Sequence, residues 1–394
     1  MILEIYQFND ILNGKPHVLV VFFILFVVIP SIVMRYYSDK YKPYISQNRI
    51  STDRVSIIIP VLHEKYEILR DTLLSAYRQN PKDIILVFDG GKDEGVERAI
   101  KIPEIQDKLQ VIRFEKRMGK KRAVIVAAKQ STCEFVITMD SDTIFMADNT
   151  LSEMLIPMEN EMVGSVSPMS HAYRIGSYLA HQLSMINEMC RNVVNKALNY
   201  HIVVAYGSCV LWRKQAMLDM QHEYLGMKIN GKLCEAGEDR CLTRLITKYG
   251  YETAVQSTAN IKCASPSTMR AFINQRLRWT RSGFMFFIQD VKEWHMPSKR
   301  YAFHCFTFYM APIFFSISLL LDTFCFGNVN IFTIPILLMV VGVTLISLFR
   351  NVIKLKYYNV ITAFITGIFG LVILFPLSLY SYCTTKKLTW VLER

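Results

Sequence analysis

The sequence lacks the cysteine patterns of a zinc-binding or disulfide-bonded protein. Its nine cysteines include no Cys-x-x-Cys pair and no cysteine–histidine pair at zinc-ligand spacing, which argues against a zinc site. They are scattered through a domain that we place in the cytosol, so we expect reduced thiols. The chain also lacks internal repeats and low-complexity stretches, which argues against a repeat architecture.

The composition excludes both a typical soluble protein and a pure membrane bundle. Of the 394 residues, 52% are hydrophobic and 20% are charged. We therefore expect a soluble domain of about 200–250 residues joined to a few membrane spans. The formal net charge of +12 does not indicate a nucleic-acid partner, because the basic residues cluster beside apolar segments, as the positive-inside rule expects. These residues are Arg35, Lys40, Lys42, Lys299, Arg300, Arg350, Lys354 and Lys356.

An uncharged apolar run at residues 17–34 has the minimum length for a membrane span. The alternative is a cleaved signal peptide. The preceding residues include Glu4 and Asp10 rather than a basic segment, and no small-residue cleavage site follows. Because Arg35 and Lys40 follow the run, we expect the N-terminus outside and the next domain in the cytosol.

The C-terminal part of the chain predicts a membrane region. Residues 269–290 read as an amphipathic helix on the membrane surface. Two spans follow at about 301–321 and 329–349. Residues 358–383 are followed by two lysines, so we interpret them as a re-entrant or interfacial segment. The predicted organisation is an N-terminal segment with one span (1–50), a cytosolic catalytic domain (51–265), interface helices (266–300) and a membrane region with a cytosolic tail (301–394).

Between residues 51 and 265, strand-like and helix-like segments alternate. This pattern predicts a mostly parallel sheet with helices on both faces, and ligands bind beyond the carboxyl ends of such strands. The predicted strands are 55–60, 83–89, 109–114 and 134–140, and the predicted helices are 67–79, 121–130 and 240–249.

Acidic residues follow two of these strands. Asp140-Ser141-Asp142 could hold Mg²⁺ or Mn²⁺ together with a substrate diphosphate, because these ions prefer oxygen ligands; the alternative is a solvated turn. Asp89 could accept a hydrogen bond from a nucleobase or could belong to the turn formed with Gly90-Gly91.

The basic loop at residues 116–122 places Gly119 and Lys120 at a helix start. It would suit an anion, either a phosphate or a sugar carboxylate; the alternative is a solvated loop. Gly237-Glu238-Asp239-Arg240 opens another helix. Its acids could cap that helix, and Asp239 could also remove a proton from an attacking hydroxyl group.

Gln275-Arg276-Leu277-Arg278-Trp279 is the most informative stretch. Positions 275 and 279 share a helix face. Trp stacks on sugar rings and Arg grips diphosphate oxygens. The alternative is a membrane-surface helix whose arginines contact lipid phosphates.

In this order, the motifs resemble those of the processive family-2 glycosyltransferases, which include cellulose, chitin and hyaluronan synthases. The resemblance covers residues 53–394 and looks closest to bacterial hyaluronan synthases and the type 3 pneumococcal capsule synthase. Two positions depart from the family pattern: Leu62-His63-Glu64 stands where an Asn usually precedes the Glu, and Thr389-Trp390-Val391 replaces a terminal Trp-Gly-Thr.

The resemblance implies an α/β GT-A catalytic domain fused to a small transmembrane bundle with interfacial helices. It implies Asp239 as the catalytic base beside Glu238, and Asp142 as a metal ligand beside Asp140. The residues implied to bind the UDP-sugar are Asp89, Lys120, Lys121, Asp140, Gln275, Arg276, Arg278 and Trp279. Those implied to bind the acceptor are Tyr206, Gly207, Ser208, Trp279 and Trp390.

We therefore predict a multi-pass plasma-membrane enzyme with a cytosolic catalytic domain. It would polymerise UDP-glucuronate (UDP-GlcA), UDP-N-acetylglucosamine (UDP-GlcNAc) or UDP-glucose (UDP-Glc) and translocate the polysaccharide, with hyaluronan as the favoured product. A type 3-like capsular synthase, a chitin-like synthase, a non-processive transferase acting on a lipid phosphate and an inactive export scaffold are the alternatives.

Overall fold

The protein is described by a computed structural model covering residues 18–229, 232–233, 236–325, 369 and 373–385. It divides into two compact units. One contains the described parts of residues 1–35 and 303–383, and the other contains those of residues 36–302 and 384–394.

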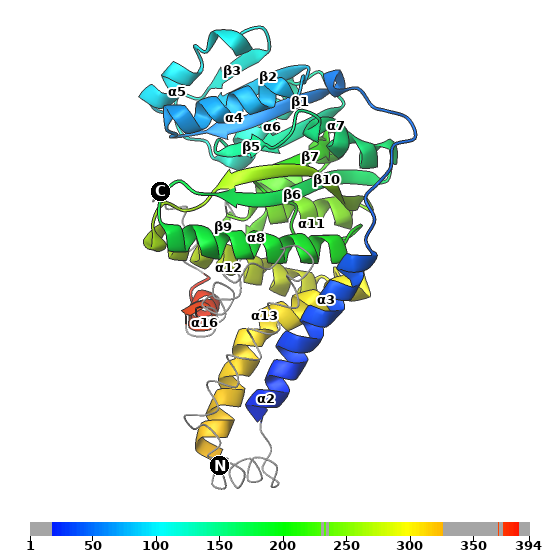
Figure 1. Cartoon of the computed structure of the whole chain (residues 1–394), viewed down its shortest axis with the longest axis vertical. Coiled ribbons are helices and arrows are strands. Elements are labelled where there is room, and N and C mark those ends of the chain that lie inside the picture. The colour runs from blue at the N-terminus through cyan, green and yellow to red at the C-terminus, as the bar shows by residue number, and fades with distance from the viewer. Residues whose placement is uncertain (1–17, 230–231, 234–235, 326–368, 370–372, 386–394) are drawn as a thin grey trace, which may run out of the picture. The chain divides into compact units, whose positions relative to one another are not determined.

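The larger unit is built around an eight-stranded sheet with the order β3-β2-β1-β4-β7-β6-β10-β5 (Figure 1). The strands are β1 (Val55–Val61), β2 (Asp83–Phe88), β3 (Leu109–Arg113), β4 (Phe135–Met139), β5 (Thr143–Phe145), β6 (Val163–Tyr173), β7 (Cys209–Arg213) and β10 (Glu252–Ala264). A short hairpin joins β8 (Lys228–Ile229) to β9 (Lys232–Leu233). Strands β2 and β4 are buried along their whole length, which explains why they read as continuous apolar runs.

The prediction of a mostly parallel sheet is confirmed only in part. Strands β3, β2, β1 and β4 are parallel, as is the β6–β10 pair, whereas β7 runs antiparallel to both β4 and β6, and β5 runs antiparallel to β10. The sheet is therefore mixed. The strand–helix alternation that predicts parallel pairing ends at β4, where the short strand β5 follows after a turn without a crossover helix.

The predicted strands and helices agree with the observed elements to within one or two residues. Helices α4, α6 and α11 correspond to the predicted 67–79, 121–130 and 240–249, and α12 is the predicted amphipathic helix. Figure 1 shows α8 and α12 on the β6–β10 side of the sheet. The helices of this unit are α4 (Tyr66–Arg78), α5 (Glu94–Ala99), α6 (Lys120–Gln130), α7 (Thr150–Leu155), α8 (Tyr178–Ala197), α9 (Lys214–Asp219), α10 (Gln221–Gly226), α11 (Glu238–Lys248) and α12 (Met269–Lys292), with short 3₁₀ turns η2 (Thr52–Arg54), η3 (Pro103–Ile105) and η4 (Ile156–Glu159).

Two helices are long and apolar enough to span a bilayer. The first, Val18–Lys40, comprises α2 (Val18–Phe23), a π-helical turn η1 (Ile24–Val28) and α3 (Ile29–Lys40). The second, Lys299–Cys325, comprises α13 (Lys299–Leu320) and a π-helical turn η5 (Leu321–Cys325). These helices overlap the predicted spans 17–34 and 301–321, and each extends beyond its predicted end.

The rest of the predicted membrane region falls mainly outside the described residues. The span at 329–349 lies there entirely. Of the segment 358–383, the structure describes residue 369 and residues 373–383, which include α16 (Phe375–Cys383). In the smaller unit, the buried Asp322 carboxylate accepts hydrogen bonds from the backbone N–H groups of Val18 (3.1 Å) and Leu19 (2.7 Å), which caps the start of α2.

Candidate active site

Hydrogen bonds made by Ser141 and Asp140 hold the acidic triplet Asp140-Ser141-Asp142 after β4. The Ser141 hydroxyl donates to Glu64 Oε2 (2.9 Å), and the Ser141 carbonyl accepts from the Thr72 hydroxyl (2.9 Å). The Asp140 N–H donates to the Ser208 carbonyl (2.9 Å). The triplet is therefore a fixed turn at the carboxyl end of a buried strand, as the parallel-sheet rule predicts for a ligand site.

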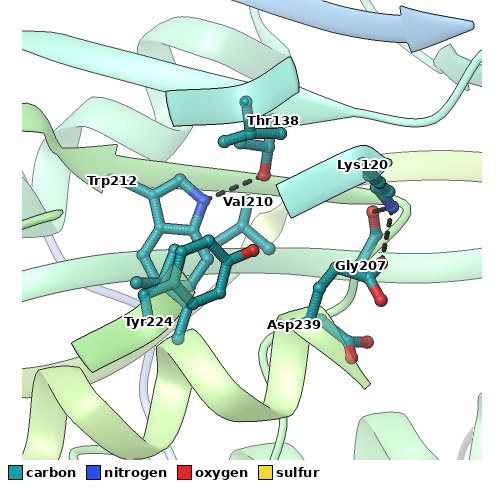
Figure 2. A pocket seen from close by; sticks show the side chains of 10 residues that line it. Lys120, Thr138, Gly207, Val210, Trp212, Tyr224 and Asp239 are labelled. Atoms are coloured by element: carbon teal, nitrogen blue, oxygen red, sulfur yellow. Dashed lines mark hydrogen bonds and ion pairs between the residues drawn. The ribbon is translucent and has the colours of Figure 1, made fainter. Parts of the chain in front are cut away.

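Lys120 joins this triplet to the second acidic motif. At the start of α6, its Nζ lies 2.6 Å from Asp140 Oδ1, 2.8 Å from Glu238 Oε1 and 3.4 Å from the Gly207 carbonyl oxygen. Burial favours a lower pKa for Lys120, but the two carboxylates outweigh it and hold the pKa above its ordinary value. Three segments separated by up to about a hundred residues therefore meet at one ammonium group. Figure 2 shows Lys120 beside Gly207 and Asp239.

The two acids at the start of α11 differ in their protonation behaviour. Burial, together with the neighbouring Glu238 charge, raises the pKa of Asp239 to about 6, against the opposing effect of Lys120. For Glu238, burial acts to raise the pKa, but the ion pair with Lys120 holds it below its ordinary value. The Lys120 ion pair therefore favours the anionic form of Glu238, whereas Asp239 can take up a proton near neutral pH, which suits a general base.

Backbone geometry fixes the Asp239 carboxylate. Gly237 precedes the helix in a left-handed conformation (φ 71°), which favours glycine. The Arg240 N–H donates to Asp239 Oδ1 (2.8 Å). A Cβ added at Gly207 would lie 2.8 Å from Asp239 Oδ2, so only a glycine at this position lets the 206–208 segment approach the carboxylate so closely.

The predicted motif on α12 packs against α8. Trp279 is 38% exposed, and the Arg276 guanidinium lies 4.9 Å from its ring centre. Arg276 also donates to Asn187 Oδ1 (2.6 Å) on α8. Burial lowers the pKa of Arg276 to about 10, which leaves it charged at neutral pH. Arg278 lies close enough to Glu238 to lower its pKa.

Helix α8 supplies residues that the sequence analysis missed. The Arg191 guanidinium lies close to two aromatic rings, 4.3 Å from the centre of Tyr206 and 5.3 Å from that of Trp279. The buried Tyr206 hydroxyl donates to Asn192 Oδ1 (2.8 Å). Helix α8 thus joins two predicted acceptor positions, Tyr206 and Trp279.

Other predicted site residues lie in different environments. Asp89 accepts hydrogen bonds from the Met118 (2.6 Å) and Gly119 (3.0 Å) N–H groups, so it anchors the basic loop before α6. Lys121 makes a different contact from Lys120: its buried Nζ donates to the Tyr224 carbonyl oxygen (3.2 Å). Gln275 is half-buried on α12. Trp390 lies outside the described residues.

A small cavity of about 20 Å³ adjoins Asp239 (Figure 2). Its volume is enough for about one water molecule. On one wall, the Trp212 indole N–H donates to the Thr138 hydroxyl (2.9 Å). The lining residues are Lys120, Val124, Thr138, Gly207, Val210, Trp212, Tyr224, Glu238, Asp239 and Leu242.

The chain is similar to several known glycosyltransferases. The chain is 23% identical over 344 residues to an N-acetylglucosaminyltransferase of Mesorhizobium japonicum, covering 86% of this chain and 81% of the relative. It is 26% identical over 353 residues to a hyaluronan synthase of Streptococcus pyogenes, covering 86% and 82%. A solved mannosyltransferase of Pyrobaculum calidifontis, in complex with GDP-mannose and Mn²⁺, matches with a TM-score of 0.58 at 15% identity, covering 86% of this chain and 94% of that structure.

The likeness to the solved structure shows the fold alone, and the mixed sheet is that of a GT-A glycosyltransferase. Residues 56–220 match the model of glycosyl transferase family 2. This match and the named relatives support the family predicted from the motifs, and residues 56–220 carry a family-2 glycosyltransferase domain.

Proposed function

We propose that this enzyme is a membrane-embedded, processive, inverting glycosyltransferase that joins UDP-sugars into an extracellular polysaccharide and moves the polymer across the bilayer. Hyaluronan is the product that we favour, because a relative named hyaluronan synthase aligns with 86% of this chain. The relatives named N-acetylglucosaminyltransferase keep a chitin-like product open, and a type 3-like capsular polymer of glucuronate and glucose is the other candidate.

The observation that carries the catalytic proposal is the position of Lys120 between Asp140 and Glu238. An ammonium group beside two acidic motifs can contact a diphosphate while leaving Asp239 next to the reacting sugar. We assign to Lys120 the contact with the donor diphosphate, and to Arg278, which lies near Glu238, a second contact. A bidentate guanidinium is well matched to phosphate oxygens.

The residues at the triplet fit a divalent metal. The described residues contain no cluster of three or more His, Cys, Asp or Glu side chains that could hold a metal by themselves. Asp140 and Asp142 offer two carboxylates on a fixed turn, which fits Mg²⁺ or Mn²⁺, since these ions are often held by one or two carboxylates plus substrate phosphates. When bound, the ion would neutralise negative charge on the leaving diphosphate.

The proposed chemistry is a single displacement. Asp239 takes the proton of the acceptor hydroxyl while that oxygen forms a bond to the anomeric carbon of the donor. The bond from the anomeric carbon to the diphosphate oxygen breaks, and UDP leaves with the electron pair. One displacement inverts the anomeric configuration. Burial and the Glu238 charge raise the pKa of Asp239 to about 6. This value still leaves Asp239 mostly deprotonated at neutral pH.

The acceptor end of the polymer would lie beside Trp279. This ring is partly exposed, and the neighbouring Arg191 and Arg276 guanidinium groups hold it in place. A partly exposed aromatic face suits stacking against a sugar ring. The Tyr206 ring also contacts Arg191, and Tyr206 would support this subsite together with Gly207 and Ser208.

A membrane location is supported by the two helices Val18–Lys40 and Lys299–Cys325, each long enough to cross a bilayer. We propose a multi-pass plasma-membrane protein with its catalytic domain in the cytosol, where UDP-sugars are made. The basic residues Arg35 and Lys40 after the first apolar run favour this orientation.

The test is UDP release by the purified protein in detergent with Mn²⁺. UDP-GlcA, UDP-GlcNAc and UDP-Glc are supplied singly and in pairs, and any product is treated with hyaluronidase. Release that needs UDP-GlcA and UDP-GlcNAc, with a hyaluronidase-sensitive product, supports hyaluronan. A requirement for UDP-GlcA and UDP-Glc points to the capsular polymer, and turnover of one donor points to a homopolymer. If no donor releases UDP, the synthase proposal is wrong and the inactive scaffold is favoured.

A further inference from the structure

Asp290, near the end of α12, is a fully buried acid that plays no part in the proposed chemistry. Its side chain is 0% exposed and accepts from Arg244 Nε (2.5 Å), Arg240 Nη2 (3.3 Å) and the Tyr301 hydroxyl (2.8 Å). Both arginines belong to α11 and are themselves buried. The carboxylate therefore connects α12 to two successive turns of α11 through charged hydrogen bonds.

The opposite end of the same interface is unusually close. A Cβ added at Gly237, where α11 begins, would lie 3.0 Å from Ser282 Cβ and 3.2 Å from Phe286 Cε2. Ser282, Phe286 and Asp290 are spaced by four residues and so form one stripe along α12. Trp279 lies one turn before Ser282 on this stripe, and its carbonyl accepts from the Ser282 hydroxyl (3.2 Å).

Arg240 links the base to this stripe directly. Its backbone N–H donates to Asp239 Oδ1 (2.8 Å), while its guanidinium group reaches Asp290. A shift of α11 along α12 would therefore move the Asp239 carboxylate relative to Trp279, and Asp290 opposes such a shift because its two oxygens hold two different turns of α11.

We propose that Asp290 is a positioning residue that sets the register of α11 against α12, so that Asp239 faces the acceptor hydroxyl of a sugar stacked on Trp279. This inference rests on the proposed roles of Asp239 and Trp279. Stability alone does not account for the cluster, since apolar residues of similar volume often replace buried ion pairs without loss of stability. The charged contacts fix the register of α11 against α12, because each hydrogen bond requires one particular pairing of residues.

The test compares sugar transfer with donor hydrolysis in Asp290→Asn. Water can reach Asp239 without being aligned by Trp279, whereas a polymer hydroxyl cannot. We expect transfer to polymer to fall roughly ten- to hundredfold, as for a displacement of about 1 Å at a reacting centre. UDP-sugar hydrolysis and the donor Kd should change by less than about threefold. Equal loss of transfer and hydrolysis would overturn the proposal in favour of a purely structural role.

Two further variants guard against misfolding of Asp290→Asn. Tyr301→Phe removes only the hydroxyl that donates to Asp290 and should lower the transfer-to-hydrolysis ratio in the same direction by a smaller factor. Glu293→Gln is the matched control: Glu293 lies on the exposed side of the same interface, where it pairs with Arg244 Nη2 (2.7 Å), and its loss should leave the ratio unchanged. An unchanged ratio in Tyr301→Phe together with an unchanged ratio in Asp290→Asn would refute the inference.

A double variant separates this inference from the proposed function. If Asp290 acts through the alignment with Trp279, then Asp290→Asn should lower transfer little further in a Trp279→Ala background, because coupled residues are non-additive. Fully multiplicative losses would refute the coupling. If the unmodified protein releases no UDP from any donor, the proposed function fails first, whereas an active wild type with an unaffected Asp290→Asn variant refutes only the positioning role.

Discussion

Replacing Asp239 by Asn should make the protein more stable and nearly inactive at the same time. The side chains are close in shape, so the change removes the charge of a half-buried carboxylate and little else. Burial and the nearby Glu238 charge raise the pKa of Asp239 to about 6. A group that is harder to ionise in the folded state than in the unfolded state destabilises the fold wherever it is ionised.

The size of the effect follows from the pKa. The difference between about 6 and the ordinary 3.8 corresponds to about 3 kcal/mol. Because the folded carboxyl binds its proton more tightly, wild-type stability falls as the pH rises from about 4 to about 6 and is then level. Asn still needs hydrogen bonds when buried, so we expect a net gain of about 1–3 kcal/mol above pH 6, or several degrees in Tm, and almost none at pH 4.

Catalysis should move the other way, since loss of a general base typically costs about 10²- to 10⁴-fold. The assay measures thermal unfolding of wild type and Asp239→Asn in detergent at pH 4, 5.5 and 7.5, with polymer synthesis and UDP-sugar binding at pH 7.5. Donor binding should persist. Retained turnover would exclude Asp239 as the base. An unchanged or lower Tm at pH 7.5 would show that the ionised Asp239 carboxylate does not destabilise the folded protein.

Further predictions concern the same site. The rate of polymer synthesis in wild type should fall with a midpoint near pH 6 on the acidic side, because protonated Asp239 cannot accept a proton; a midpoint near pH 4 would contradict the burial argument. EDTA should stop turnover, and Mg²⁺ or Mn²⁺ should restore it, whereas indifference to chelation would exclude Asp140 and Asp142 as metal ligands. Trp279→Ala should impair elongation about two- to tenfold more than UDP-sugar hydrolysis, as expected for the loss of one stacking contact, and equal losses would assign the ring a structural role. Gly207→Ala should reduce turnover strongly with a change in Tm of only a few degrees, since its Cβ would lie 2.8 Å from Asp239 Oδ2; full activity would show that the segment can move.

The sequence predicts the first half of the sheet well because its strands are short, apolar and bounded by turns. The remaining strands lack that signal. Strand β6 lies inside the sheet, yet it contains the buried residues Ser165, Ser167 and Ser170. Its sequence therefore resembles that of a polar segment and does not indicate a buried strand. Strand β10 shifts its register between Gln256 and Asn260, which interrupts any simple alternation. Antiparallel pairing through these strands depends on tertiary contacts that no local pattern records.

Short motifs predict the residues of the site better than they predict the contacts of those residues. The two acidic motifs predict Asp140-Ser141-Asp142 and Asp239 as site residues, but only the fold shows that Lys120 pairs with both motifs, through Asp140 and Glu238. Helix α8 was missed because it carries no recognisable motif. A usable signal was present, since Glu188 and Asn192 are polar residues one turn apart on the buried face of an otherwise amphipathic helix. Buried polar pairs of this kind need partners, and here one of the partners is Tyr206.

The charges near Asp239 lead us to expect that a diphosphate donor and a divalent metal bind together. Besides burial, the charges that shift the pKa of Asp239 are those of Glu238, Lys120 and Arg191, and Lys120 is already paired with Asp140 and Glu238. A diphosphate bound alone would add negative charge beside the half-buried Asp239 and would raise its pKa further. Asp140 and Asp142 would hold a divalent cation, which would supply the positive charge that offsets the diphosphate. Lys120, which pairs with Asp140, would then be available to contact the phosphate oxygens. The expected loss of activity on chelation and the pKa of Asp239 therefore depend on the same nearby charges. A variant that alters Lys120 should change both.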